Sequence, residues 1–131
     1  MKKIIVILVI IVIHFGCIKD NFYSYSSSLF GDWSWFSTCG GIAGICYTPK
    51  STNQKINLVF TSDSIFKKFV NDTLNTSGKF WVYKLVSTDT KDTTNVINYG
   101  SASQMFLIIH DTLYLDDFCC DRYSSGFKRI K

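Results

Sequence analysis

Four cysteines carry the most reactive side chains after the first segment of the chain: Cys39, Cys46, Cys119 and Cys120. The chain begins like an exported protein, in which an even number of cysteines is typical of disulfides. A bridge between the neighbours Cys119 and Cys120 is strained. We therefore expect Cys39 and Cys46 to be bonded one to each of Cys119 and Cys120. Zinc is the weaker alternative, because zinc knuckles use C-x₂₋₄-C spacings that these pairs lack.

Other side chains able to do acid–base chemistry are few. His110 is the only histidine after the leader, and it lies between two apolar runs, where a solvated turn residue is expected. The group Asp116, Asp117 and Asp121 has the residue types for paired carboxylates or a Ca²⁺ site. A solvated turn is the simpler interpretation. The sequence thus predicts a protein that is not an enzyme, without cofactor or metal.

Two further ligand classes are disfavoured by the residues present. The stretch "GGIAG" within Gly31–Pro49 has the glycines of a phosphate loop but lacks the Gly-Lys-Ser/Thr ending, and no helix is expected after it. It is better explained as a loop in which only glycine fits.

The formal net charge is +4, of which Lys2 and Lys3 contribute two, and no basic stripe accompanies the aromatics. Nucleic acid is therefore not an expected partner.

The first residues predict export and lipidation. Lys2 and Lys3 precede the apolar run Ile4–Ile13, which is too short to cross a bilayer as a helix and is typical of a secretory signal. Cys17 follows directly after Gly16, and this arrangement resembles the acylation site of bacterial lipoproteins. The resemblance implies a signal peptide over 1–16 and an acyl anchor on Cys17.

A polar, Ser-rich segment separates this cysteine from the rest of the chain. Residues 17–29 are expected to form the acylated Cys and a flexible tether, and 30–131 to form one small domain. Lys19 and Asp20 resemble the short charged signal that directs some lipoproteins outward. That resemblance implies a lipoprotein of the outer membrane of a Gram-negative cell, either periplasmic or surface-exposed.

The composition of the domain favours strands. All ten acidic residues are Asp, and Ala43 and Ala102 are the only alanines, so strong helix formers are nearly absent. The segments with strand character are 32–38, 55–61, 65–71, 79–86, 95–101, 104–117 as a hairpin, and 126–131. About eight short strands with short turns predict an all-β fold, a small antiparallel up-and-down barrel.

One motif gives this barrel a family resemblance. Gly31 and Trp33 form a Gly-x-Trp at the start of the first strand, and Arg129 lies in the last. This pattern resembles lipocalins, and with the lipoprotein leader it resembles the lipocalin-like bacterial lipoproteins. The resemblance implies an end cap in which Arg129, or secondly Arg122, stacks over Trp33.

The resemblance also implies a binding function. Aromatic residues on strand faces that are able to point inward are the candidate lining of a site for a small apolar ligand: Trp35, Phe60, Trp81, Tyr83 and Tyr99. The alternative is a barrel filled by its own side chains that binds an envelope protein through its loops, as an inhibitor or a subunit. An interior cavity of a few hundred cubic ångströms favours the first, and a solid core favours the second.

Overall fold

The computed structural model describes residues 28–118 and 121–131. The expected signal peptide, Cys17, the tether to residue 27, Cys119 and Cys120 lie outside the described residues. Over the described part, no helix has the length and apolar character needed to cross a membrane.

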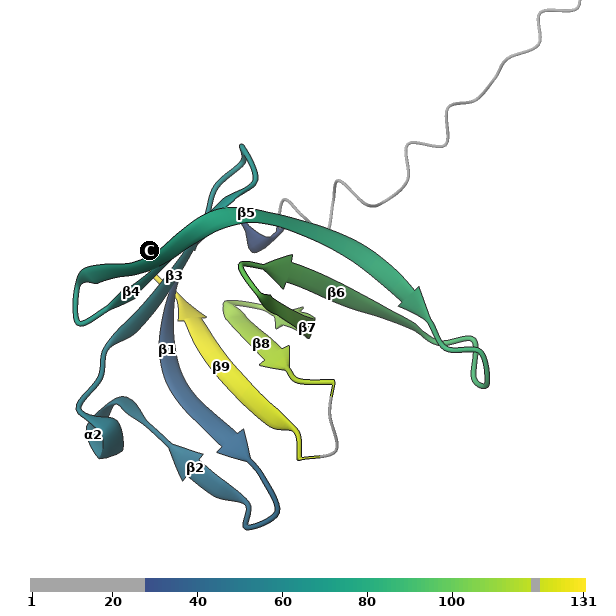
Figure 1. Ribbon diagram of the computed structural model, residues 1–131, viewed down its shortest axis with the longest axis horizontal. Helices are drawn as coiled ribbons and strands as arrows, with labels where there is room; N and C mark the ends of the chain where they lie inside the picture. Colours follow the sequence, from purple (N-terminus) through teal and green to yellow (C-terminus); the bar gives the residue numbers. More distant parts are fainter. Residues whose placement is uncertain (1–27, 119–120) are drawn as a thin grey trace, which may run out of the picture.

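The architecture is the predicted one: a closed antiparallel barrel of eight strands, with one extra strand (Figure 1). The strands are β1 (Gly31–Gly40), β2 (Ile45–Tyr47), β3 (Ile56–Phe60), β4 (Ile65–Val70), β5 (Thr73–Val86), β6 (Thr93–Tyr99), β7 (Ala102–Ile109), β8 (Thr112–Asp116) and β9 (Tyr123–Arg129). A short helix, α2 (Pro49–Thr52), joins β2 to β3. The sheet order is β2-β1-β3-β4-β5-β6-β7-β8-β9, and pairing of β1 with β9 closes the barrel.

Tight turns explain why neighbouring strands pair in chain order. Asn71 and Asp72, between β4 and β5, both have positive φ (49° and 63°), a backbone suited to a two-residue hairpin. His110 lies at the turn between β7 and β8, as expected from the sequence, and also has a positive φ of 53°. Successive hairpins of this kind produce the up-and-down topology.

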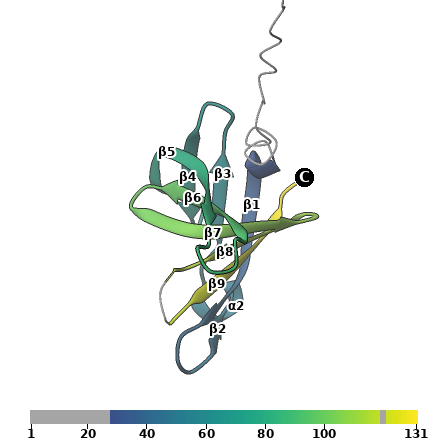
Figure 2. The same cartoon turned by 90° about the vertical axis from the view of Figure 1, so that its right-hand side faces the viewer.

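The extra strand belongs to a hairpin that projects beyond the barrel. β2 pairs with β1 over Thr38–Tyr47, Cys39–Cys46 and Gly40–Ile45. Both views place this hairpin at the end of the barrel opposite the first described residues (Figures 1 and 2). Its connecting turn contains the "GGIAG" glycines, of which Gly41 and Gly44 have φ of 73° and 61°. The glycines therefore serve backbone geometry, as expected.

Strand β5 is the main departure from the predicted strands. It has 14 residues, longer than the expected segment 79–86, and with β6 it extends past the barrel (Figure 1). Phe80 and Val82 are buried, whereas Trp81 is 57% exposed and Tyr83 is 36% exposed. The expectation that Trp81 and Tyr83 line the interior is therefore wrong. Neighbouring side chains of a strand point to opposite faces, and here Phe80 points inward.

The core fills one part of the barrel interior. Its fully buried side chains include Leu29, Trp33, Phe60, Phe66 and Leu113. Phe60 contacts Phe80 and Tyr99 edge to face, with ring centres 5.1 and 6.1 Å apart. The interior is solid around these residues and open further along the barrel.

Candidate functional site

One end of the barrel is closed by Trp33 and Arg129. Trp33 is fully buried, and its Nε1 donates a hydrogen bond to the Leu29 carbonyl at 2.8 Å. The guanidinium of Arg129 lies over the Trp33 ring, with its central carbon 4.1 Å from the ring centre. Arg129 also donates to the carbonyls of Phe30 (2.7 Å) and Ser28 (2.6 Å). Trp33 and Arg129 thus have the end-cap arrangement that the sequence predicts, and Gly31 leaves the space that the Arg129 side chain occupies.

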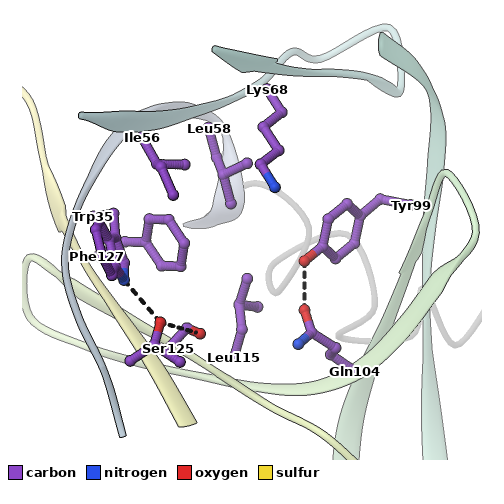
Figure 3. Close-up of a pocket in the computed structure, with 10 residues that line it drawn as sticks. Trp35, Ile56, Leu58, Lys68, Tyr99, Gln104, Leu115, Ser125 and Phe127 are labelled. Atoms are coloured by element: carbon purple, nitrogen blue, oxygen red, sulfur yellow. Dashed lines mark hydrogen bonds between the residues drawn. The ribbon is translucent and has the colours of Figure 1, made fainter. Parts of the chain in front are cut away.

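Towards the opposite end, the interior contains a cavity of about 230 Å³ (Figure 3). The strand register places it there, because Trp33 pairs with Arg129 at the closed end while Thr38 pairs with Ser125 further along β1 and β9. Its lining comprises Trp35, Thr38, Ile56, Leu58, Lys68, Tyr99, Gln104, Leu115, Ser125 and Phe127. The cavity therefore has apolar walls with a few polar groups, the usual character of a small-molecule site.

A first polar group lies where β1 meets β9. The indole Nε1 of Trp35 donates to Thr38 Oγ1 at 2.8 Å, and Thr38 Oγ1 is 2.8 Å from Ser125 Oγ. The two hydroxyls have two hydrogens, and a single one is used in the bond between them. One hydroxyl hydrogen is left for an acceptor in the cavity.

A second polar group lies along one side of the cavity, where the neighbouring strands β6 and β7 meet. The Tyr99 hydroxyl donates to Gln104 Oε1, and Gln104 Nε2 donates to Asp117 Oδ1 at 2.7 Å (Figure 3 shows the first of these bonds). Burial, and secondly the negative charge of Asp117, raise the pKa of Tyr99 to about 12. Tyr99 is therefore a neutral phenol at physiological pH, and its ring is held in place by a hydrogen bond.

Lys68 is the charged member of the lining. It pairs with Leu58 in the β3–β4 register, and Leu58 points into the core. Lys68 therefore lies on the inner face of β4, whereas its neighbour Lys67 is exposed on the outer face. Figure 3 shows the Lys68 amine in the cavity, on the same side as the Tyr99 hydroxyl.

Two of the five predicted ligand residues, Trp35 and Tyr99, line this cavity. Phe60 is a buried core residue that contacts Tyr99 but is not part of the lining. Trp81 and Tyr83 lie on the outside of the barrel and do not contribute.

The polar lining residues were not identified from the sequence. The inward position of Lys68 could have been found from the sequence. Inward and outward positions alternate along a strand, so Lys68 shares the inner face with Phe66, and Lys67 lies on the outer face. Gln104 and Ser125 have no such signal, since hydroxyls and amides are common on both faces of strands in this chain.

The predicted pairing of the cysteines is wrong. Cys39 and Cys46 are bonded to each other, with an S–S distance of 2.10 Å. They are directly opposite each other on β1 and β2, and such neighbours bring their sulfur atoms together. The expected bonds to Cys119 and Cys120 are therefore excluded.

In the part of the chain that the structure describes, the acidic candidates Asp116, Asp117 and Asp121 are not gathered into a metal-binding group. Within residues 28–118 and 121–131, no three His, Cys, Asp or Glu side chains form a group able to hold a metal ion. Asp117 is engaged with Gln104, and Asp121 is exposed. The Oδ1 atom of Asp116 is buried without a hydrogen-bond partner in the described part of the chain.

The fold and cavity define a closed β-barrel protein with a small, mixed-polarity interior site. No family model matches this chain, and no curated protein matches it either.

Proposed function

We propose that this protein is a membrane-anchored lipocalin-like lipoprotein whose barrel binds a small apolar ligand. The observation that carries the proposal is the cavity of about 230 Å³ next to Trp35 and Tyr99, inside the barrel and beside its buried core. This volume is below the range of about 300–1,000 Å³ for sites that hold drug-sized ligands. The expected ligand is correspondingly small.

The end cap supports the assignment to the lipocalin-like lipoproteins. A Gly-x-Trp at the start of β1, with an arginine of the last strand stacked on the tryptophan, is the feature on which the sequence resemblance rested. It lies at the end where the described chain begins at residue 28. The segment that would carry the proposed acyl group therefore enters the barrel at the closed end, not at the end that contains the cavity. The proposed location is the outer membrane of a Gram-negative cell, and no catalytic role is proposed.

The β1–β2 hairpin favours a second candidate function, binding of an envelope protein through the loops. Its tip exposes apolar side chains: Ile42 is 93% exposed and Ile45 is 51% exposed. The Cys39–Cys46 disulfide joins the two strands directly behind this tip. A rigid apolar tip loses little conformational entropy on binding a protein surface.

Mass spectrometry of organic extracts distinguishes the two functions. The full-length protein is purified from its native membrane and compared with the variant Ser125→Phe, whose new side chain occupies the cavity. Ser124→Phe is the matched control, because Ser124 is exposed on the outer face of β9. We expect a small molecule to co-purify with the wild type and the control and to be absent from Ser125→Phe. Identical extracts from all three proteins, together with a protein partner lost on Ile42→Ser, contradict ligand binding and favour the second function.

The anchor is tested separately. Cys17→Ala is expected to abolish incorporation of labelled palmitate and to release the protein from the membrane fraction. A variant that still takes up label contradicts the lipoprotein assignment and leaves the proposal for the cavity intact.

A further inference from the structure

We infer that the ligand of the cavity is a small organic carboxylate whose anionic group binds the Lys68 ammonium. This inference rests on the proposed ligand-binding function and names the chemical class of the ligand. Three features of the cavity point to this class: one inward-facing lysine, a lining without an acidic side chain, and unused hydrogen-bond donors around the lysine.

Lys68 is placed inside the barrel by the strand register. Its partner on β3 is Leu58, which is 2% exposed, and Phe66, two residues earlier on the same strand face, is also 2% exposed. The flexible stem of the lysine packs along apolar surface while its ammonium reaches the cavity (Figure 3). Burying part of a positive charge is costly unless an opposite charge compensates it.

No such charge is present in the lining. The lining residues include no Asp, and the ion pairs Lys55–Asp72 and Lys131–Asp111 both lie at the surface, away from the cavity lining. Asp117 is the acidic group tied to the cavity network, and it accepts its hydrogen bond from Gln104. Lys68 therefore has three N–H donors facing a cavity without an acidic side chain. A bound anion completes this arrangement.

The neutral polar groups favour the same ligand. One hydroxyl hydrogen of the Thr38–Ser125 pair is unused, and Gln104 Nε2 has a second hydrogen beyond the one given to Asp117. With Lys68 these groups present donors from three sides of one cavity. Charge-assisted hydrogen bonds to a carboxylate are among the stronger polar contacts in proteins.

The rest of the lining selects an apolar body for this anion. Trp35, Leu58, Leu115 and Phe127 are at most 6% exposed and form the walls of the cavity. A free inorganic anion leaves these walls without contacts, whereas a short alkyl or aromatic chain covers them. A monocarboxylate with a short apolar body satisfies both the charge and the walls.

The test compares three probes with the same alkyl chain: hexanoate, 1-hexanol and hexylamine. The full-length protein, freed of co-purified molecules, is titrated with each by calorimetry. Two variants are paired: Lys68→Met removes the charge inside the cavity, and Lys67→Met removes a charge from the outer face of the same strand. Lys68→Arg restores a cation.

We expect hexanoate to bind at least about tenfold more tightly than hexanol or hexylamine. Lys68→Met is expected to lose this preference by weakening hexanoate alone, while Lys67→Met retains it and Lys68→Arg recovers part of it. Equal affinity for hexanoate and hexanol, no change in Lys68→Met, or equally effective competition by inorganic phosphate overturns the inference. If hexanol binds as tightly as hexanoate, the carboxylate inference is wrong but the proposed ligand-binding function is retained. If none of the three probes binds, the inference and the proposed function are both contradicted.

Discussion

Arg129 on the last strand lies over the ring of Trp33 on the first, 4.1 Å from guanidinium carbon to ring centre, and the two residues are also backbone partners in the β1–β9 ladder. One residue pair therefore joins the two strands that close the barrel. The same guanidinium donates hydrogen bonds to the carbonyls of Phe30 and Ser28, which precede β1. Closure of the sheet and closure of one barrel end thus depend on the same side chain.

Replacement of this arginine should lower stability substantially. Arg129→Met is expected to decrease the free energy of unfolding by about 2–3 kcal/mol, because it removes a partly desolvated cation–π contact and two charge-assisted hydrogen bonds. Urea unfolding followed by tryptophan fluorescence measures the change. Arg122→Met is the control, since Arg122 is exposed. Equal stability of the two variants contradicts the role assigned to the end cap.

The disulfide within the β1–β2 hairpin predicts a specific peptide map. Without reduction, the tryptic peptide that ends at Lys50 should contain an internal bond and be lighter than its reduced form by two hydrogen atoms. The reason is that Cys39 and Cys46 lie on the same tryptic peptide and are bonded to each other. A peptide cross-linked to the one that contains Cys119 and Cys120 contradicts this pairing.

Close approach of β1 and β9 predicts that Gly40 is intolerant of a side chain. A Cβ atom at this position lies 2.1 Å from the Arg122 carbonyl oxygen, so the two strands must separate to admit it. Gly40→Ala is expected to lower the free energy of unfolding by about 1–3 kcal/mol. Gly44→Asn is the comparison, because Gly44 has open space around it and Asn adopts its positive φ readily. Chemical denaturation measures the free energy of unfolding of both variants. Equal values for Gly40→Ala and Gly44→Asn contradict the close approach of β1 and β9 at Gly40.

The pKa of Tyr99 gives a prediction for alkaline pH. Burial raises this pKa to about 12, above the ordinary value of 10, so the folded state favours the neutral phenol. The resulting stabilisation is fully present below pH 10 and is lost as the pH rises from about 10 to about 12. Ultraviolet titration should show one tyrosine ionising later than the others, and Tyr99→Phe should remove that late step. Loss of the step in Tyr114→Phe instead contradicts the assignment.

The sequence was sufficient to predict the barrel and its closed end. Absence of Glu, scarcity of Ala and alternation along segments such as Lys55–Thr61 favour an all-β fold. The position of Arg129 over Trp33 was predicted from a family resemblance at short motifs. These features depend on local composition and on the two ends of the chain, which are readable without a structure.

The face of β5 and the disulfide pairing were not predictable in the same way. Residues 80–83 read Phe-Trp-Val-Tyr, so both faces of this strand are hydrophobic and alternation does not indicate which one points inward. The cysteine pairing depended on β2, a strand of three residues that lacks a periodic signal. The cavity itself depends on the register of the seven strands that contribute its lining, which is a tertiary property.

The most direct test of ligand binding in the barrel is a crystal structure of the full-length protein, purified from its native membrane without removal of bound molecules. We expect electron density for a small molecule between Trp35 and Tyr99, with an oxygen within hydrogen-bond distance of Lys68 Nζ. Density for water alone in this cavity, or for an organic molecule seated on the outer face at Trp81 instead, contradicts it.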